Sequence, residues 1–185
     1  MKTFVITTLL FVSSFNSFSQ TVQDINLLQA DSSWSKEIFP FPLRFAPEID
    51  FHGVEEARFP GGWSDPKSDE FWSYVFVWQI RLKKPLNALG LETHLKTYFD
   101  GLTRQENTSS LVLTNKDTSI NADFVGEVRL SKPFNSDQAL TLNVTIEQQF
   151  ENENQTGILL FRFSPQDREH KIWQKLNAVR YRDDC

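Results

Sequence analysis

The chain has 185 residues, a formal net charge of −5 and a pI near 5.2. This acidic balance argues against non-specific binding to nucleic acid, which needs clustered Lys and Arg, and against electrostatic attraction to an anionic membrane. Seventeen Phe, five Trp and three Tyr supply enough aromatic area for a substantial core, and the length suits a single domain.

The N-terminus has the layout of a secretory signal peptide. Lys2 supplies a short positive region, residues 4–12 are mostly apolar, and Ser17 and Ser19 place small residues at the −3 and −1 positions of a cleavage site. The apolar run is too short to span a bilayer as a permanent helix. The alternative interpretation is a buried N-terminal strand or helix.

Cleavage after this segment defines the domain organisation that we expect. Residues 1–19 would be the signal peptide, and residues 20–185 a single domain exported to the periplasm or secreted, with 20–36 as a flexible arm or a short helix. No later stretch is long and apolar enough for a transmembrane helix, so we predict no transmembrane segment in the mature chain.

The segment 39–62 is rich in Pro, Gly and Phe, which disfavours long regular structure. Within it, residues 43–46 and 54–59 are each compatible with a short edge strand. Residues 72–82 then alternate in character, and alternate side chains of a strand point to opposite faces of a sheet. One face would carry an apolar wall made of Trp72, Tyr74, Phe76, Trp78 and Ile80.

Two helical patterns and four strand-like segments follow this wall. Apolar residues recur with helical spacing over residues 88–105, which predicts an amphipathic helix. Ser164 is the expected N-cap of a terminal helix that begins at Pro165 and runs to about residue 180. The predicted strands between the two helices are 111–114, 120–130, 140–147 and 157–163.

This order of elements predicts an α+β fold. We expect an antiparallel sheet of about five to six strands with two amphipathic helices packed on one face. Both helices would cover the aromatic wall, and Trp173 of the terminal helix would be part of that cover.

One short segment carries the candidate catalytic residues. Asp50 and His52 lie on the same side of an extended stretch, with Glu55 and Glu56 close by, a fragment of the oxygen and nitrogen sites that transition metals occupy. A site needs three or four ligands, and the other two histidines lie on predicted helices without a matching partner. The simpler interpretation is a solvated loop, so we predict no metal site and no cofactor. The chain also lacks the sequence signatures of a nucleophile elbow or a phosphate-binding loop.

Trp63, Phe71 and Trp72 are the candidates for ligand binding. They lie at a Gly-Gly turn and at the entry to the aromatic strand, where we expect them to be nearest the surface. Contiguous exposed apolar area usually marks a binding site. The alternative is that aromatic residues at strand spacing belong to the core.

The single cysteine, Cys185, is the last residue of the chain. It offers an intermolecular disulfide and so a disulfide-linked dimer, although a chain terminus usually has no structural role. Catalysis by this thiol is not expected, because Asp183 and Asp184 adjoin it and a reactive thiolate needs an electropositive setting.

Four blocks of sequence together resemble a family of uncharacterised exported bacterial proteins. They are FPLRFAPEIDFHGVEEARFPGGW at 41–63, FWSYVFVW at 71–78, YFDGL at 98–102 and FSPQDREHKIWQKL at 163–176. The blocks extend over most of the mature chain. Because the family has no assigned activity, the resemblance implies that these blocks belong to one domain and carries over no catalytic residue.

These observations favour a non-enzymatic binding or interaction module of the cell envelope or extracellular space. Its partner would be an envelope or extracellular protein, a glycan or a small ligand, and not a nucleic acid. Two alternatives stay open. One is a hydrolase, metal-assisted or not, with a site around Asp50, His52 and Glu55, and the other is a structural component of the envelope.

Overall fold

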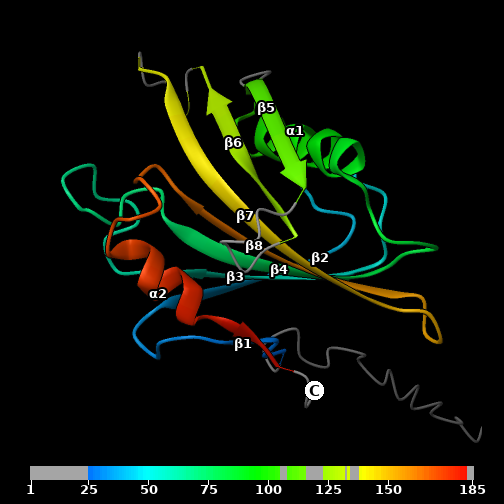
Figure 1. Ribbon diagram of the computed structural model, residues 1–185. Coiled ribbons are helices and arrows are strands. Elements are labelled where there is room, and N and C mark those ends of the chain that lie inside the picture. The colour runs from blue at the N-terminus through cyan, green and yellow to red at the C-terminus, as the bar shows by residue number, and fades with distance from the viewer. Residues whose placement is uncertain (1–24, 105–107, 116–122, 132, 134–137, 183–185) are drawn as a thin grey trace, which may run out of the picture.

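A computed structural model describes residues 25–104, 108–115, 123–131, 133 and 138–182 (Figure 1). The predicted signal peptide with its cleavage site, and Cys185, lie outside the described residues. In chain order the elements are β1 (Leu28–Gln29), β2 (Ser35–Pro40), β3 (Gly53–Phe59), β4 (Tyr74–Arg81), α1 (Ala88–Thr103), β5 (Thr108–Asn115), β6 (Phe124–Leu130), β7 (Leu140–Glu151), β8 (Thr156–Ser164), α2 (Ile172–Ala178) and β9 (Arg180–Tyr181).

Within the described residues, seven strands form one antiparallel sheet in the order β2-β3-β4-β8-β7-β6-β5. The fold is therefore α+β with an antiparallel sheet, as predicted, but the sheet is larger than the five to six strands expected. The additional strand is β2, whose alternation is hidden in a segment rich in Phe and Pro. Two segments were predicted as edge strands. The segment 54–59 is instead an interior strand that pairs on both sides, and the segment 43–46 forms only an isolated bridge between Leu43 and Ala46.

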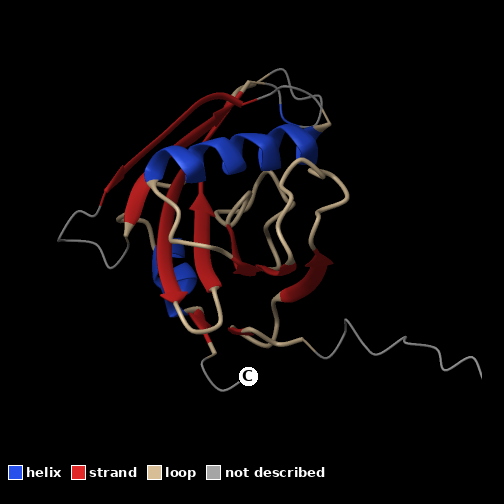
Figure 2. Cartoon of the chain, turned by 90° about the vertical axis from the view of Figure 1, so that its right-hand side faces the viewer, coloured by secondary structure: helices blue, strands red, loops and turns tan. Residues whose placement is uncertain are grey.

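The aromatic wall lies on the face of the sheet that α1 covers. Tyr74, Phe76, Trp78 and Ile80 are all buried in one cluster with the apolar side of α1, which consists of Leu91, Leu95, Tyr98 and Phe99. Figure 2 shows α1 lying across the curved sheet. The helix begins where Asn87 accepts a hydrogen bond from the Gly90 N–H at 2.9 Å, and it ends at Arg104, which has a left-handed backbone with φ of 59°.

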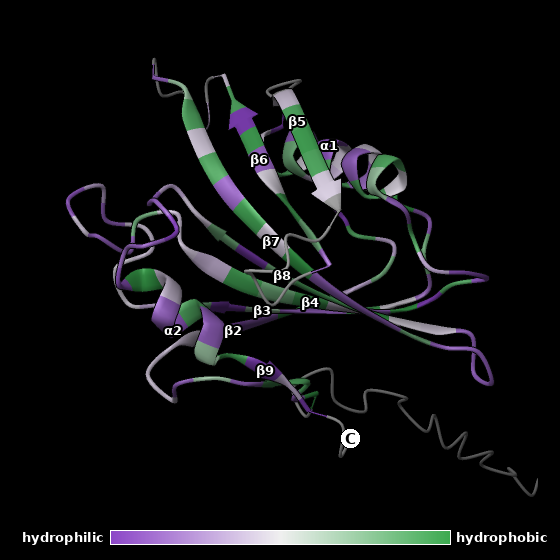
Figure 3. Cartoon of the chain, in the orientation of Figure 1, coloured by the Kyte–Doolittle hydropathy of each residue, from purple (hydrophilic) through white to green (hydrophobic). Residues whose placement is uncertain are grey.

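The second helix packs on the opposite face, so the prediction that both helices cover the aromatic wall is wrong. Ile172, Trp173 and Leu176 of α2 share a cluster with the other set of alternate residues on the two central strands, Val75, Val77, Ile158 and Leu160. The physical reason is that β4 and β8 are apolar on both faces, so each face needs its own cover. Figure 3 shows hydrophobic residues along the strands of the sheet and on both helices, whereas the turn between β7 and β8 is hydrophilic.

The segment from Ile25 to Trp34 also packs against this second face. Leu27, Leu28 and Trp34 are buried in the same cluster as α2, and β1 pairs with β9. The Leu27 N–H donates to the buried Glu56 carboxylate over 2.5 Å. The described part of the segment expected as an arm is therefore a fixed part of the domain.

The terminal helix is shorter than predicted and begins later. Ser164 is the last residue of β8 and not a helix N-cap; its hydroxyl hydrogen-bonds with that of Ser73 over 2.8 Å and accepts the Gln166 N–H. The helix α2 occupies only residues Ile172–Ala178. The Ser-Pro signal thus marks the turn that leaves the sheet, because a serine hydroxyl can cap a turn as well as a helix.

Arg162 of β8 joins α2 to the sheet. Its buried guanidinium donates to the carbonyl oxygens of Leu176 at 2.9 Å and Val179 at 3.1 Å, and to Glu147 at 2.7 Å. The two carbonyl groups belong to the last turn of α2 and the residue that follows it, where the helix leaves acceptors without internal partners. A single side chain therefore satisfies the end of the helix and holds it on the sheet.

Gly101 lets α1 approach the loop that precedes β3. A Cβ atom at this position would lie 1.9 Å from the carbonyl oxygen of Phe45. We expect Gly101→Ala to lower the free energy of unfolding by about 1–3 kcal/mol, because backbone must move to remove the overlap. Urea unfolding followed by tryptophan fluorescence measures the change.

The matched control is Gly90→Ala in the first turn of the same helix. Its Cβ would lie 3.2 Å from the Asn87 Oδ1, so the exposed cap must shift by only a few tenths of an ångström, and alanine favours helix formation. Equal unfolding midpoints for the two variants would contradict the close approach at Gly101.

Candidate functional site

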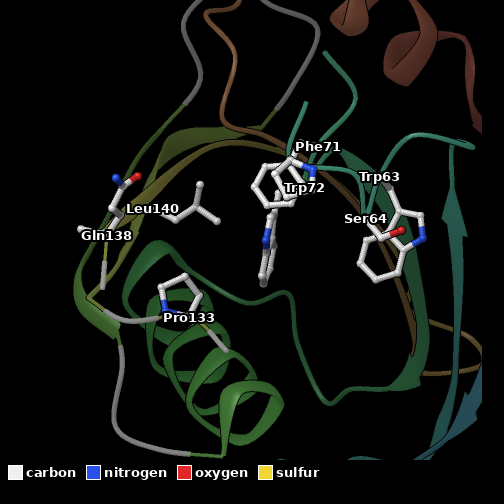
Figure 4. A pocket seen from close by; sticks show the side chains of 9 residues that line it. Trp63, Ser64, Phe71, Trp72, Pro133, Gln138 and Leu140 are labelled. Atoms are coloured by element: carbon white, nitrogen blue, oxygen red, sulfur yellow. The ribbon is translucent and has the colours of Figure 1, made fainter. Parts of the chain in front are cut away.

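A hollow at one end of the aromatic face is lined by the three predicted ligand-binding residues. We call it the outer pocket; it has a volume of about 460 Å³. The loop between β3 and β4 contributes Trp63, Phe71 and Trp72, and the chain between β6 and β7 contributes Pro133 and the residues that lead into Leu140. Figure 4 shows the Trp63 and Trp72 rings, Pro133 and Leu140 around a common space. The complete lining is Trp63, Ser64, Pro66, Phe71, Trp72, Pro133, Gln138, Ala139 and Leu140.

Hydrogen bonds within the loop hold the segment that carries the three aromatic residues. The Trp72 N–H donates to the Trp63 carbonyl oxygen over 2.8 Å, and the Glu70 carboxylate accepts the Gly62 N–H over 2.9 Å. Trp72 has a φ of 53°, a conformation that a bulky side chain rarely adopts. Strain of this kind costs about 1–3 kcal/mol and occurs preferentially at functional sites.

A second, smaller hollow adjoins the outer pocket, since Trp63 and Trp72 line both. We call it the inner cavity; it has a volume of about 90 Å³. Its only acidic lining residue is Glu37, which is exposed and so lies on the solvent side. The aromatic side chains that line it are Phe39, Phe45, Phe59, Trp63, Trp72, Tyr74 and Tyr98.

A buried carboxyl group adjoins this cavity. Glu55 is fully buried, and its two carboxylate oxygens accept hydrogen bonds from the Trp78 indole at 2.7 Å and the Tyr98 hydroxyl at 3.0 Å. Burial raises the pKa of Glu55 to about 8, although both hydrogen bonds act in the opposite direction. The Glu55 carboxyl is therefore largely protonated at neutral pH.

The Tyr74 hydroxyl is buried and has no hydrogen-bond partner among the described residues. Burial raises the pKa of Tyr74 and of Tyr98 well above the usual value, and the negative charge of Glu55 adds to both shifts. Both tyrosines thus stay neutral. A buried polar group without a partner costs about 1–3 kcal/mol, so the Tyr74 hydroxyl calls for an explanation.

The structure does not bring the four candidate catalytic residues together. Asp50 and His52 are exposed, whereas Glu55 and Glu56 are buried on opposite faces of β3. The Glu56 carboxylate accepts from the Leu27 N–H and forms an ion pair with Arg58 at 2.7 Å. Among the described residues, no three side chains of the metal-binding kinds form a group that could hold an ion.

A third hollow, of about 420 Å³, lies beside α2 and the segment that follows β1. Its charged side chains have partners: Glu70 and Lys175 form an ion pair at 2.7 Å, and Asp31 accepts from Ser33. This pairing leaves the third hollow with less capacity for a ligand than the outer pocket, whose lining is mainly aromatic and apolar.

Sequence reasoning did not identify Glu37, Tyr74 and Tyr98 as parts of a site. Tyr74 was assigned to the core wall and Tyr98 to the buried side of a helix, and each is indeed buried. One signal was present: Glu55 is a charged residue in the same alternate set of β3 as Ala57 and Phe59, and it pairs directly with Trp78 in the neighbouring strand. A carboxylate at an inward-facing position opposite an indole predicts a buried hydrogen bond.

No protein-family model, curated protein or solved structure matches this chain. Within the described residues, no helix has the length and apolar character needed to span a membrane.

Proposed function

We propose that this protein is an exported binding module that takes a small ligand in the outer pocket. The observation that carries the proposal is the convergence of Trp63, Phe71 and Trp72 on one hollow of about 460 Å³. That volume lies in the range of small-molecule sites, which are concave and mostly apolar with a few polar groups. The signal-peptide layout and the resemblance to exported bacterial proteins support export.

The outer pocket can supply affinity through its rings. Trp63 and Phe71 are only partly buried, so each presents ring surface that a ligand would remove from water. Trp72 is buried and lines both the outer pocket and the inner cavity, so packing restricts the motion of its ring. A rigid aromatic surface loses little conformational entropy on binding.

Alanine substitution of the two partly buried rings tests this proposal. The neutral fluorescent probe N-phenyl-1-naphthylamine is expected to bind the parent protein, and Trp63→Ala and Phe71→Ala are each expected to weaken binding about tenfold or more, because hot-spot aromatic residues contribute at least 1–2 kcal/mol. A fluorescence titration measures the dissociation constants.

The matched control is Phe150→Ala, which removes a partly buried ring at the far end of β7 from Leu140. It is expected to leave probe affinity within about twofold of the parent, since the ring does not line the outer pocket. If all three variants bind the probe as the parent does, the outer pocket is not the binding site.

A further inference from the structure

The inner cavity differs in its chemistry from the outer pocket. Aromatic rings make up almost all of its lining, and its volume of about 90 Å³ equals roughly three water molecules. Aromatic rings carry a negative potential on their faces and attract cations. Cages of such rings recognise methylated ammonium groups elsewhere in proteins.

The charged side chain that lines the inner cavity is acidic. It is Glu37; Glu55 lies behind Tyr98 and accepts a hydrogen bond from its hydroxyl over 3.0 Å, but Glu55 is largely protonated at neutral pH. No Lys or Arg is among the lining residues. A cation in the cavity would therefore be attracted and an anion repelled.

The Tyr74 hydroxyl gives a second and independent indication. Tyr74 lines the cavity from β4, and its hydroxyl is buried and lacks a partner among the described residues. Its oxygen is an acceptor for an N–H⁺ group or for the polarised C–H groups next to a quaternary nitrogen. A ligand that brings such a group would give the Tyr74 oxygen the partner that it lacks among the described residues.

We propose that the inner cavity holds the methylated ammonium group of a ligand whose remaining part lies in the outer pocket. This inference rests on the proposed binding function and names the chemical class of the ligand. Trp63 and Trp72 line both hollows, so one molecule can place its cation among the rings and its body against Phe71 and Leu140. Glu37 balances the charge from the solvent side.

The test compares choline with 3,3-dimethylbutan-1-ol, which has the same shape but carries carbon in place of the charged nitrogen. Tryptophan fluorescence of the full protein is followed during titration, because Trp63 and Trp72 line the cavity. We expect choline to bind at least tenfold more tightly than its neutral analogue. Equal binding of the two, or tighter binding of the neutral compound, would overturn the inference.

Two variants sharpen this comparison. Glu37→Gln is expected to lower the affinity for choline at least fivefold and to leave the affinity for the neutral analogue unchanged. Glu48→Gln, at another exposed position, is expected to change neither affinity. Tyr74→Phe is expected to lower the affinity for 2-(dimethylamino)ethanol, which carries an N–H⁺ group, more than it lowers the affinity for choline. If Glu37→Gln and Tyr74→Phe leave all affinities unchanged, neither side chain contacts the cation and the inference fails.

Failure of this inference is distinguishable from failure of the proposed function. If the naphthylamine probe still depends on Trp63 and Phe71 while choline shows no advantage over its analogue, the outer pocket binds ligands and only the cation assignment falls. The methylated ammonium group could belong to a lipid headgroup or to a soluble ligand, and co-sedimentation with vesicles distinguishes the two. If the protein sediments with phosphatidylcholine vesicles but not with phosphatidylglycerol vesicles, the group belongs to a lipid headgroup. If the protein binds choline but sediments with neither, the group belongs to a soluble ligand.

Discussion

Glu55→Gln is expected to remove most of the loss of stability that the protein undergoes between about pH 5 and pH 8. Burial raises the pKa of Glu55 from 4.5 to about 8, so between these values the folded protein binds a proton that the unfolded chain has released. The free energy of unfolding therefore falls as pH rises through this window, by up to about 1.4 kcal/mol per pH unit. Above about pH 8 both states are ionised at Glu55 and the decline ends.

Glutamine reproduces the protonated carboxyl without titrating. Its oxygen can accept from the Trp78 indole, and its amide can donate to the Tyr98 oxygen, whose own hydrogen then turns away. Urea unfolding at pH 5, 6, 7 and 8 measures the slope for the parent and the variant. Glu48→Gln, which changes an exposed carboxylate, should keep the parent slope. If the free energy of unfolding falls with pH equally steeply in Glu55→Gln and in the parent, this carboxyl does not govern the pH dependence.

Arg162→Ala is expected to lower the free energy of unfolding by about 3 kcal/mol. The substitution leaves the carbonyl groups of Leu176 and Val179 without their donor and Glu147 without its partner. Removing one member of a buried ion pair costs about 3–5 kcal/mol, and the partial exposure of Glu147 places the value at the lower end. Loss of this anchor should also loosen α2 and expose Trp173.

Lys175→Ala is the matched control for Arg162→Ala. Lys175 also lies on α2 and also forms an ion pair, with Glu70 at 2.7 Å, but its side chain is 58% exposed. Exposed pairs contribute about 1 kcal/mol or less, so the control should unfold close to the parent. Both variants are compared by urea unfolding, and the Trp173 environment by acrylamide quenching. An Arg162→Ala midpoint equal to that of Lys175→Ala would rule out the anchoring role.

Local patterns predicted much of the fold because each element carries its own periodicity. The helix 88–105 corresponds to α1, Ala88–Thr103, and the alternation over 72–82 corresponds to β4, Tyr74–Arg81. The segments predicted as strands before and after residue 140 lie within β5 to β8 or overlap them. These elements depend on the spacing of apolar residues along the chain, which is visible without tertiary contacts.

Only some residues of the candidate site could be predicted from the sequence. Trp63, Phe71 and Trp72 were selected because they surround a turn next to a strong strand, and they line one pocket. Glu37 and Tyr98 were not selected, because they lie 61 positions apart (37 to 98) and meet only when β2 and α1 approach the same end of the sheet. The group of Asp50, His52 and Glu55 was suggested by proximity in sequence, yet Glu55 points into the core from β3, whereas Asp50 and His52 lie exposed in the segment before that strand.

The amino-acid pattern alone determined that Trp72 to Ile80 form an apolar face and that an amphipathic helix is available to cover it. Tertiary structure decided which helix does so. Since β4 and β8 are apolar on both faces, periodicity cannot say which face α2 covers, and the choice follows from Arg162, which points to that face and binds the end of α2. The same packing places Glu55 behind Tyr98 and leaves the Tyr74 hydroxyl without a partner among the described residues, and these features together define the inner cavity.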